Sequence, residues 1–183
     1  MKKRVFISMV LTIIALAASR PDSRAFFWTG AAVMLLGQLV RLAASAAIVK
    51  SKTLTTKGPY AVVRNPLYLG TLVMTAGMML AMTSTAKPVL TALLWAGVGA
   101  SFAWIYYVTI KAEEIFLRSA YGQTFEDYCK SVPALLACPC AFGGFFEAGA
   151  YSLEVFRKNK EWRGLSGLAA ILIILYLKLH YGY

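Results

Sequence analysis

The chain has 183 residues, 59% of them hydrophobic and 15% charged, with a formal net charge of +11 and a mean hydropathy of +0.63. This composition excludes an ordinary soluble domain, because several apolar runs are about as long as a span of the roughly 30 Å hydrocarbon core of a bilayer. The charge alone would suit a nucleic-acid partner, but the Lys and Arg residues gather beside the apolar runs and no nucleic-acid motif accompanies them. We therefore expect a membrane protein that does not bind nucleic acid.

The apolar runs predict an all-α polytopic membrane protein with about five transmembrane helices. Residues 5–19 follow a basic start, which is typical both of a signal peptide and of a short first span. We favour a retained helix because it gives a consistent topology. The other spans are predicted at residues 25–49, 67–86, 89–110 and 164–179.

Two further segments lie between the fourth and fifth spans. Residues 111–132 are charged and amphipathic, so we expect them outside the bilayer. Residues 134–150 are apolar but contain Gly, Pro and Cys, and the sequence leaves open whether they enter the membrane. The three cysteines and the single histidine do not supply the four ligands of a zinc site, so no metal is expected.

The distribution of basic residues predicts the orientation. With the N-terminus inside, fourteen Lys and Arg residues lie in cytosolic segments and four lie outside, while Arg41 is within a span. This satisfies the positive-inside rule and predicts a C-terminus on the outer side. Residues 58–70 and 111–132 should then share the cytosolic face of a bacterial-type inner or plasma membrane.

A polar, turn-rich segment, residues 58–70, leads into the third span, and we call it the corner. Gly58-Pro59 is a turn signal, because proline fixes its own φ and glycine permits dihedrals that other residues avoid. Asn65-Pro66 is typical of an N-cap followed by proline at the first helical position. So specific a corner in a hydrophobic protein indicates a binding role.

Two glutamates follow the fourth span. Glu114 is either functional or paired on the helix surface with Lys111 or Arg118, three and four residues away. Glu113 faces about 100° away, where no such partner is predicted, so it is the better candidate for a cationic ligand.

Gln38 and Arg41 lie inside the second span. An ionisable residue at membrane depth is a functional candidate. The alternative, which we favour, is that Arg41 extends towards the cytosolic interface from near the helix end.

The corner and the glutamates together resemble a known family. Residues 58–70 contain Gly-Pro-Tyr, three residues, then Arg-Asn-Pro-x-Tyr-x-Gly, and resemble the G-P-Y-x-x-x-R-H-P-x-Y-x-G signature of the isoprenylcysteine carboxyl methyltransferase and phospholipid methyltransferase family. Glu113-Glu114-x-x-Leu117, Tyr121-Gly122, Tyr128 and Val132-Pro133 look like its second set of motifs. The resemblance covers residues 50–133, and a motif match gains weight when its elements occur in order.

The resemblance implies a single membrane methyltransferase domain over residues 1–183, with a motif-bearing core at about 50–133. It implies S-adenosylmethionine as cofactor at the cytosolic face, and a lipophilic or lipidated acceptor that arrives from the membrane lipids. Arg64, Glu113 and Glu114 are the implied catalytic residues, and we expect Arg64 and Glu113 to position the reactants without transferring protons. The implied cofactor-binding residues are Lys52, Thr53, Leu54, Thr55, Tyr60, Asn65, Pro66, Leu67, Tyr68 and Glu113.

Two departures limit the match. Asn65 stands where the family has histidine, so a hydrogen-bonding group remains but no imidazole base. The isoprenylcysteine branch has an arginine one turn before the glutamates, where this chain has Tyr107-Val108-Thr109-Ile110. A prenylcysteine carboxylate acceptor is therefore less favoured, and a phospholipid or small-thiol methyltransferase stays open. Two classes outside the methyltransferases also stay open: a relative of the sterol reductases with a nicotinamide cofactor, and a non-enzymatic transport or assembly protein.

Overall fold

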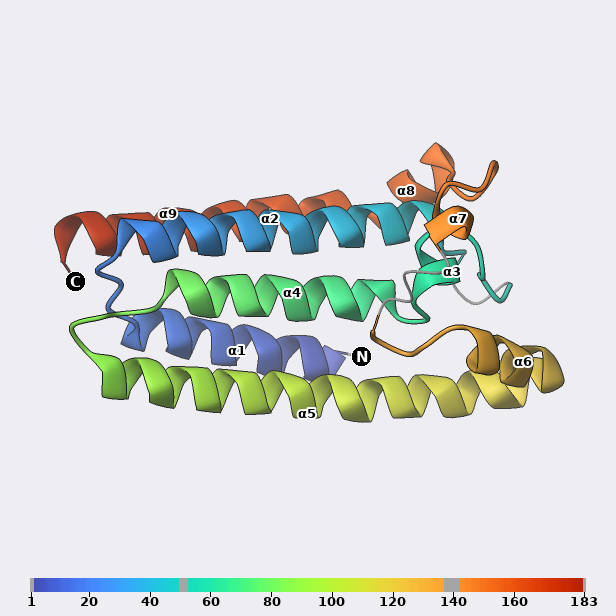
Figure 1. Cartoon of the computed structure of the whole chain (residues 1–183), viewed down its shortest axis with the longest axis horizontal. Coiled ribbons are helices and arrows are strands. Elements are labelled where there is room, and N and C mark those ends of the chain that lie inside the picture. The colour runs from blue at the N-terminus through green and yellow to red at the C-terminus, as the bar shows by residue number, and fades with distance from the viewer. Residues whose placement is uncertain (1, 50–52, 137–141, 183) are drawn as a thin grey trace. The chain divides into compact units, whose positions relative to one another are not determined.

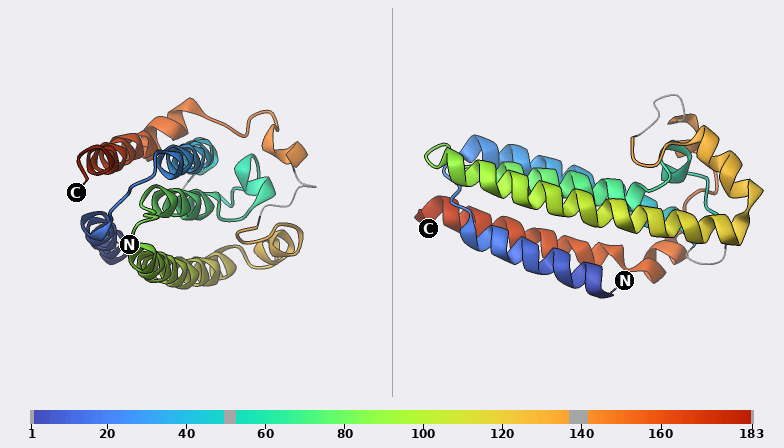
Figure 2. Two further views of the ribbon diagram at one scale, coloured as in Figure 1. Left: turned by 60° about the vertical axis from the view of Figure 1, so that its left-hand side comes forward. Right: turned by 90° about the horizontal axis from the view of Figure 1, so that it is seen from below.

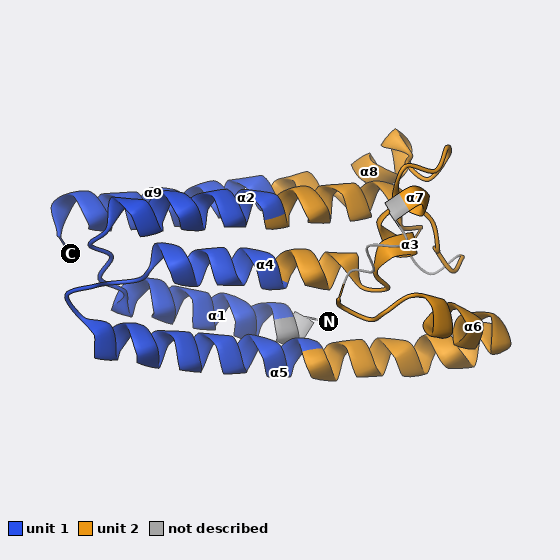
Figure 3. Ribbon diagram, viewed as in Figure 1, with its two compact units in different colours: residues 1–36, 72–106, 164–183 blue, residues 37–71, 107–163 orange. Residues whose placement is uncertain are grey.

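A computed structural model describes residues 2–49, 53–136 and 142–182, and every regular element within those ranges is helical (Figure 1). The prediction of an all-α protein is confirmed for this part of the chain. The chain forms two compact units (Figure 3), and each is described by itself. Unit 1 comprises residues 1–36, 72–106 and 164–183, and unit 2 comprises residues 37–71 and 107–163.

Unit 1 is a set of apolar helices. It contains α1 (Lys2–Ala18), the first part of α2 (Arg24–Ala47), the second part of α4 (Pro66–Ala81), the first part of α5 (Pro88–Tyr121) and α9 (Gly164–Tyr181). The helices α1 and α9 lie side by side (Figure 2). The Lys178 ammonium at the end of α9 donates to the Leu16 and Ala17 carbonyls, at 2.7 and 3.0 Å. These are carbonyls of the last turn of α1, which have no partner within that helix.

Glycines bring α2 and α4 into close contact within unit 1. A Cβ added at Gly77 would lie 2.7 Å from the Gly30 carbonyl oxygen and 2.6 Å from the Met34 nitrogen. A Cβ at Gly30 would meet the Ala81 nitrogen at 2.5 Å. The two backbones therefore touch directly, as small residues allow between apolar helices.

Among the described residues, three helices have the length and apolarity to cross a membrane: Arg24–Ala47, Pro88–Tyr121 and Glu161–Tyr181, the last including a 3₁₀ turn before α9. Two shorter apolar helices, Val5–Ala18 and Pro66–Ala81, occupy the other two predicted positions. By length, three of the five predicted spans are confirmed.

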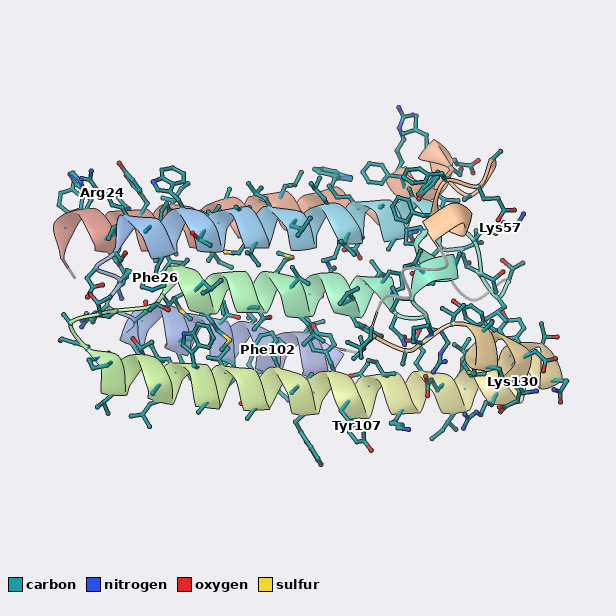
Figure 4. The ribbon with its side chains drawn as sticks, in the orientation of Figure 1. Arg24, Phe26, Lys57, Phe102, Tyr107 and Lys130 are labelled. Carbon is teal, nitrogen blue, oxygen red and sulfur yellow. The ribbon has the colours of Figure 1, made fainter. Side chains whose placement is uncertain are left out.

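Two predicted boundaries were wrong. The span expected to reach residue 86 ends at Ala81, because the hydroxyls and backbone of residues 83–87 bond locally and to Asp22. The predicted separate segment 111–132 begins inside α5, which continues unbroken to Tyr121 and stops before Gly122 at φ +51°. The boundary at residue 111 was predicted from the charged residues that begin there, but a charged residue does not end a helix, and no residue before Gly122 breaks it. Figure 4 labels Tyr107, near the middle of α5, whose side chain is exposed.

Unit 2 contains the remaining parts of α2, α4 and α5 and a group of short helices. These are α3 (Pro59–Val62), α6 (Gln123–Ser131), α7 (Phe142–Phe145), α8 (Leu153–Asn159) and the 3₁₀ turn η2 (Glu161–Arg163). Phe125, Tyr128 and Val132 form a buried cluster with Leu54, Leu117 and neighbouring side chains packed against it. Residues 137–141 lie outside the described ranges, so the behaviour of the 134–150 stretch stays a prediction.

The predicted corner is confirmed. Gly58 has φ +64°, and Pro59 is the first residue of α3. The Gly58 N–H donates to the Gly144 carbonyl at 3.1 Å, and a Cβ on Gly144 would lie 2.6 Å from that of Ala61. The backbone at Gly58 thus contacts the backbone of α7. Glycine suits position 58 because of its positive φ, and position 144 because a side chain there would collide with Ala61. As predicted, α4 starts at Pro66, with Asn65 just before it.

Candidate functional site

The two motif segments meet within unit 2 through Tyr68 and Glu113. The Tyr68 hydroxyl donates to the Glu113 carboxylate at 2.6 Å. Tyr68 lies in the first turn of α4 and Glu113 lies on the α5 extension, forty-five positions later. Glu113 is half-buried, and no Lys or Arg of the described residues is within ion-pair distance of it. Its half-buried carboxylate therefore has no ion-pair partner among the described residues.

Tyr60 packs against Leu67, the residue before Tyr68. It is buried, at 6% exposure, against Ala44 and Ala47 of α2 and against Leu67. Burial, and after it the charge of Glu113 with smaller effects from other residues, raises the pKa of the Tyr60 phenol above its ordinary value. The phenol is thus un-ionised at neutral pH and within electrostatic range of Glu113.

The carbonyl of Tyr60 anchors α6. The buried Tyr128 hydroxyl donates to it at 2.5 Å, and burial raises the pKa of Tyr128 despite the opposing charge of Arg64. Tyr128, one of the positions in the second set of motifs, therefore has a structural contact with the first set.

Arg64 and Glu114 form a buried ion pair. The Arg64 Nη2 lies 2.6 Å from Glu114 Oε1, and the two side chains are 13% and 10% exposed. The Arg64 Nη1 also donates to the Cys129 and Val132 carbonyls, at 3.0 and 2.6 Å. Arg64 thus connects α5 to the end of α6, and two of its guanidinium nitrogens are already engaged.

The surface pairs considered for Glu114 are not formed. Glu114 bonds to Arg64, fifty positions away, and Arg118 pairs with Glu126 at 2.9 Å instead. The local spacing rule failed because Glu114 points into the fold, at 8% exposure, whereas Arg118 is exposed.

Asn65 contacts the chain that follows α6. Its side-chain Nδ2 and its backbone N–H both donate to the Ala134 carbonyl, at 3.1 and 3.2 Å, and the Arg64 N–H donates to the Pro133 carbonyl at 2.9 Å. The Asn65 carbonyl accepts from the N–H groups of Tyr68 and Leu69 in the first turn of α4. The side chain at the family's histidine position thus joins the corner to the second set of motifs.

The remaining predicted residues are spread around this centre. Pro66 is fully buried, and Leu67 packs on the Tyr60 cluster. Leu54 packs on the Phe125 cluster instead, and Thr53 and Thr55 are its neighbours in the chain. Lys52 lies outside the described residues.

Sequence reasoning missed one contributor, Glu161. Its carboxylate pairs with Arg41 at 2.5 Å. Whether Arg41 extends to the cytosolic interface stays a prediction. Glu161 lies far from both motif sets in sequence, and its isolated position gave no signal.

The phospholipid methyltransferase family model matches residues 25–124, more than half of the chain. This chain belongs to that family. As a member of the phospholipid methyltransferase family with apolar helices of membrane length, it is an integral membrane protein of a methyltransferase family. The matched range includes Tyr60, Tyr68 and Glu113 but ends before Tyr128 and Glu161.

A curated relative of this family member is the cobalt-zinc-cadmium resistance protein CzcN of Cupriavidus metallidurans. The two are 31% identical over 140 residues, which cover 72% of this chain and 60% of the relative. The chain therefore spans less than two thirds of that protein's length. No solved structure matches the chain.

Proposed function

We propose that this protein is an S-adenosylmethionine-dependent methyltransferase that acts on a lipophilic or amphiphilic acceptor from the bilayer. The observation that carries the proposal is the Tyr68–Glu113 hydrogen bond with Tyr60 beside it, inside the range that the family model matches. We propose a single domain, supported by the continuity of α2, α4 and α5 through both units.

The residues present fit the cofactor chemically. Bound S-adenosylmethionine would supply an activated methyl group on a positively charged sulfonium. The Glu113 carboxylate offers a negative charge that no described Lys or Arg neutralises, and Tyr60 and Tyr68 add the phenol rings that favour a nearby cation. Low water access around a half-buried carboxylate strengthens such an attraction. We propose Tyr60, Tyr68 and Glu113 as the centre of the cofactor site, with Leu67 and Pro66 supporting it and residues 52–55 at its edge.

The transfer needs alignment more than proton transfer. When bound, the cofactor would supply the methyl group to the acceptor's lone pair and would keep the electron pair of the broken carbon–sulfur bond on its sulfur. Any proton on the acceptor passes to water. Holding the two reactants in line contributes about 7–11 kcal/mol in favourable systems. The proposed role of Glu113, Tyr60 and Tyr68 is to hold the cofactor in position.

We propose scaffold roles for Arg64, Asn65 and Glu114. Both Nη atoms of Arg64, one Glu114 oxygen and the Asn65 Nδ2 bond to the protein itself, through the buried ion pair and the carbonyls of Cys129, Val132 and Ala134. This supports a revision of the candidate catalytic set, in which Glu113 keeps the role of positioning the reactants.

The residues of α5 that precede Glu113 bear on which acceptor the protein could methylate. One turn before Glu113, the helix carries no arginine, and Lys111 lies over the Tyr107 ring at 5.9 Å. A prenylcysteine-like carboxylate therefore has no evident partner there, and the proposal includes phospholipid amines and small thiols as acceptors. The positive-inside count supports a site that faces the cytosol.

The test is incubation of purified protein with methyl-labelled S-adenosylmethionine and a membrane-lipid extract. Label in the lipid fraction is the expected result, and Glu113→Gln should abolish most of it. Base treatment then distinguishes a carboxylate acceptor from an amine or thiol, because methyl esters release volatile methanol whereas N-methyl and S-methyl products retain the label. A protein that binds no cofactor in calorimetry would be a non-enzymatic membrane protein instead.

A further inference from the structure

Arg41 occupies a polar centre within the apolar helix α2. Its Nη1 donates to the Leu67 carbonyl at 3.2 Å and to the Thr71 hydroxyl at 2.5 Å, and its Nη2 pairs with Glu161. The Thr71 hydroxyl donates to the same Leu67 carbonyl at 3.0 Å. A charged side chain at this depth is retained where its donors are satisfied, and here they are satisfied by two separate elements.

The first of these elements is the beginning of α4. Leu67 immediately precedes Tyr68, so the carbonyl that Arg41 contacts lies one residue from the proposed cofactor side chain. A Cβ on Gly70 would lie 2.6 Å from the Arg41 Cγ and 2.7 Å from the Gly37 carbonyl oxygen. The first turns of α4 are therefore packed directly on Arg41, and a shift of Arg41 would move Tyr68 with them.

The second element is the C-terminal segment of unit 2, residues 152–163. The Ser152 N–H donates to the Ala46 carbonyl at 2.9 Å, and the Asn159 amide donates to the Ser45 and Ile48 carbonyls at 2.8 and 3.0 Å. The segment thus satisfies carbonyls at the end of α2 that the helix leaves open. The buried Gln38 amide adds a longer contact to the Glu161 carbonyl, at 3.4 Å.

Tyr60 rests on the same end of α2. It packs against Ala44 and Ala47, which adjoin the residues whose carbonyls bind the C-terminal segment. The charge of Glu161 also contributes, behind burial and Glu113, to the raised pKa of the Tyr60 phenol. The second half of α2 therefore links Glu161 to both tyrosines of the proposed site: to Tyr68 through Arg41 and Leu67, and to Tyr60 through Ala44 and Ala47.

We propose that Arg41 and Glu161 are positioning residues for methyl transfer. Their ion pair fixes the first turn of α4, and so places the Tyr68 hydroxyl on Glu113. This inference rests on the proposed function. It extends the site to the C-terminal segment, which the family model does not match. Neither residue contacts the cofactor in this role, since both act through Tyr68.

A double-mutant cycle tests this indirect action. The readout is the dissociation constant of S-adenosylmethionine, measured by calorimetry on full-length protein in detergent. Tyr68→Phe and Glu161→Gln are each expected to weaken binding about tenfold, and the double variant should bind about as weakly as either one. A product of the two effects, about a hundredfold, would mean that the residues act independently and would overturn the proposal.

The controls separate positioning from stability and charge. Glu154→Gln removes an exposed carboxylate from the same segment and should leave the affinity unchanged. Thermal unfolding of every variant confirms that binding is measured on folded protein. If Glu161→Gln does not fold, Arg41→Lys, which keeps the charge but not the fork of donors, enters the same cycle.

The failures of the two proposals differ. Wild-type protein without affinity for S-adenosylmethionine contradicts the proposed function. Wild-type protein that binds, with Glu161→Gln and Arg41→Lys equal to it, contradicts the positioning role alone. A lower unfolding temperature with unchanged affinity would likewise show that the pair serves only stability.

Discussion

The hydroxyl of Tyr68 and the carboxylate of Glu113 are 2.6 Å apart, although the two residues are forty-five positions apart in the sequence and lie on different helices, α4 and α5. No described basic residue lies within ion-pair distance of Glu113. A carboxylate kept in this state is suited to a ligand that brings its own positive charge.

We therefore expect Glu113→Gln to weaken S-adenosylmethionine binding about 10- to 100-fold, because hydrogen bonds and contacts to a charged group are worth about 1.5–3 kcal/mol. Calorimetry measures the change. Glu126→Gln is the matched control, since Glu126 carries the same charge on α6 but is exposed and paired with Arg118. Equal affinities for wild type and Glu113→Gln would remove Glu113 from the site.

The Arg64–Glu114 pair predicts a stability effect. Arg64→Leu leaves the buried Glu114 carboxylate without its partner, which costs about 3–5 kcal/mol. We expect the thermal unfolding midpoint in detergent to fall by roughly 10 °C.

Arg118→Leu is the control for that prediction. It breaks an exposed pair, at 52% and 44% exposure, and should change the midpoint by a degree or two. Similar shifts for the two variants would contradict the structural role assigned to Arg64.

The glycine contacts predict a second stability effect. Gly77→Ala forces a methyl group into the Gly30 carbonyl and the Met34 backbone of α2, and overpacking of this kind costs about 1–3 kcal/mol. Gly97→Ala is a matched control, because a Cβ there meets nothing within 4 Å. It should be neutral or slightly stabilising in a helix. Equal unfolding midpoints would show that α2 and α4 are not in backbone contact.

Asp22 predicts a pH dependence. It accepts hydrogen bonds from the Ser84 hydroxyl and from the N–H groups of Thr85 and Ala86, at 2.7 to 2.9 Å. Burial opposes the ionised form, but these bonds outweigh it and lower the pKa of Asp22 to about 2 from 3.8. A lowered pKa in the folded state means that the stabilisation is complete above pH 3.8 and is lost as the pH falls towards 2.

Asp22→Asn should therefore lower the unfolding midpoint at pH 6, and the difference from wild type should shrink as the pH approaches 2. Comparison of thermal unfolding at the two pH values measures this. A difference that is independent of pH would mean that the Asp22 charge is not responsible for it.

Much of the fold follows from local chemistry in the sequence. Apolar length predicted the helices, and Gly58, Pro59 and Pro66 predicted the corner, because these residues restrict or permit backbone angles whatever surrounds them. The convergence of Tyr68 and Glu113 came from the family resemblance, since nothing local indicates a contact across forty-five residues.

The polar partners could not be predicted in the same way. Glu114 has suitable basic neighbours on its own helix, yet it bonds to Arg64 because its side chain faces inward. Arg41 pairs with Glu161 across 120 positions, where sequence spacing carries no information. The start of the charged segment was placed at residue 111, but α5 continues to Tyr121. Charged residues indicate where a helix leaves an apolar environment, whereas a residue such as Gly122 is needed to end the helix.

The unequal lengths of the two helices that carry the site have a consequence for the surrounding lipid. The sixteen residues of α4 extend about 24 Å and the thirty-four of α5 about 51 Å, against a hydrocarbon core of roughly 30 Å. The Tyr68–Glu113 bond fixes the first turn of the short helix to one level of the long one. Thick bilayers would have to thin locally around α4 or pull its ends away from that level, whereas α5 can tilt. Under the proposed function, acyl-chain length would thus become a determinant of the methylation rate, which should be highest in thin membranes.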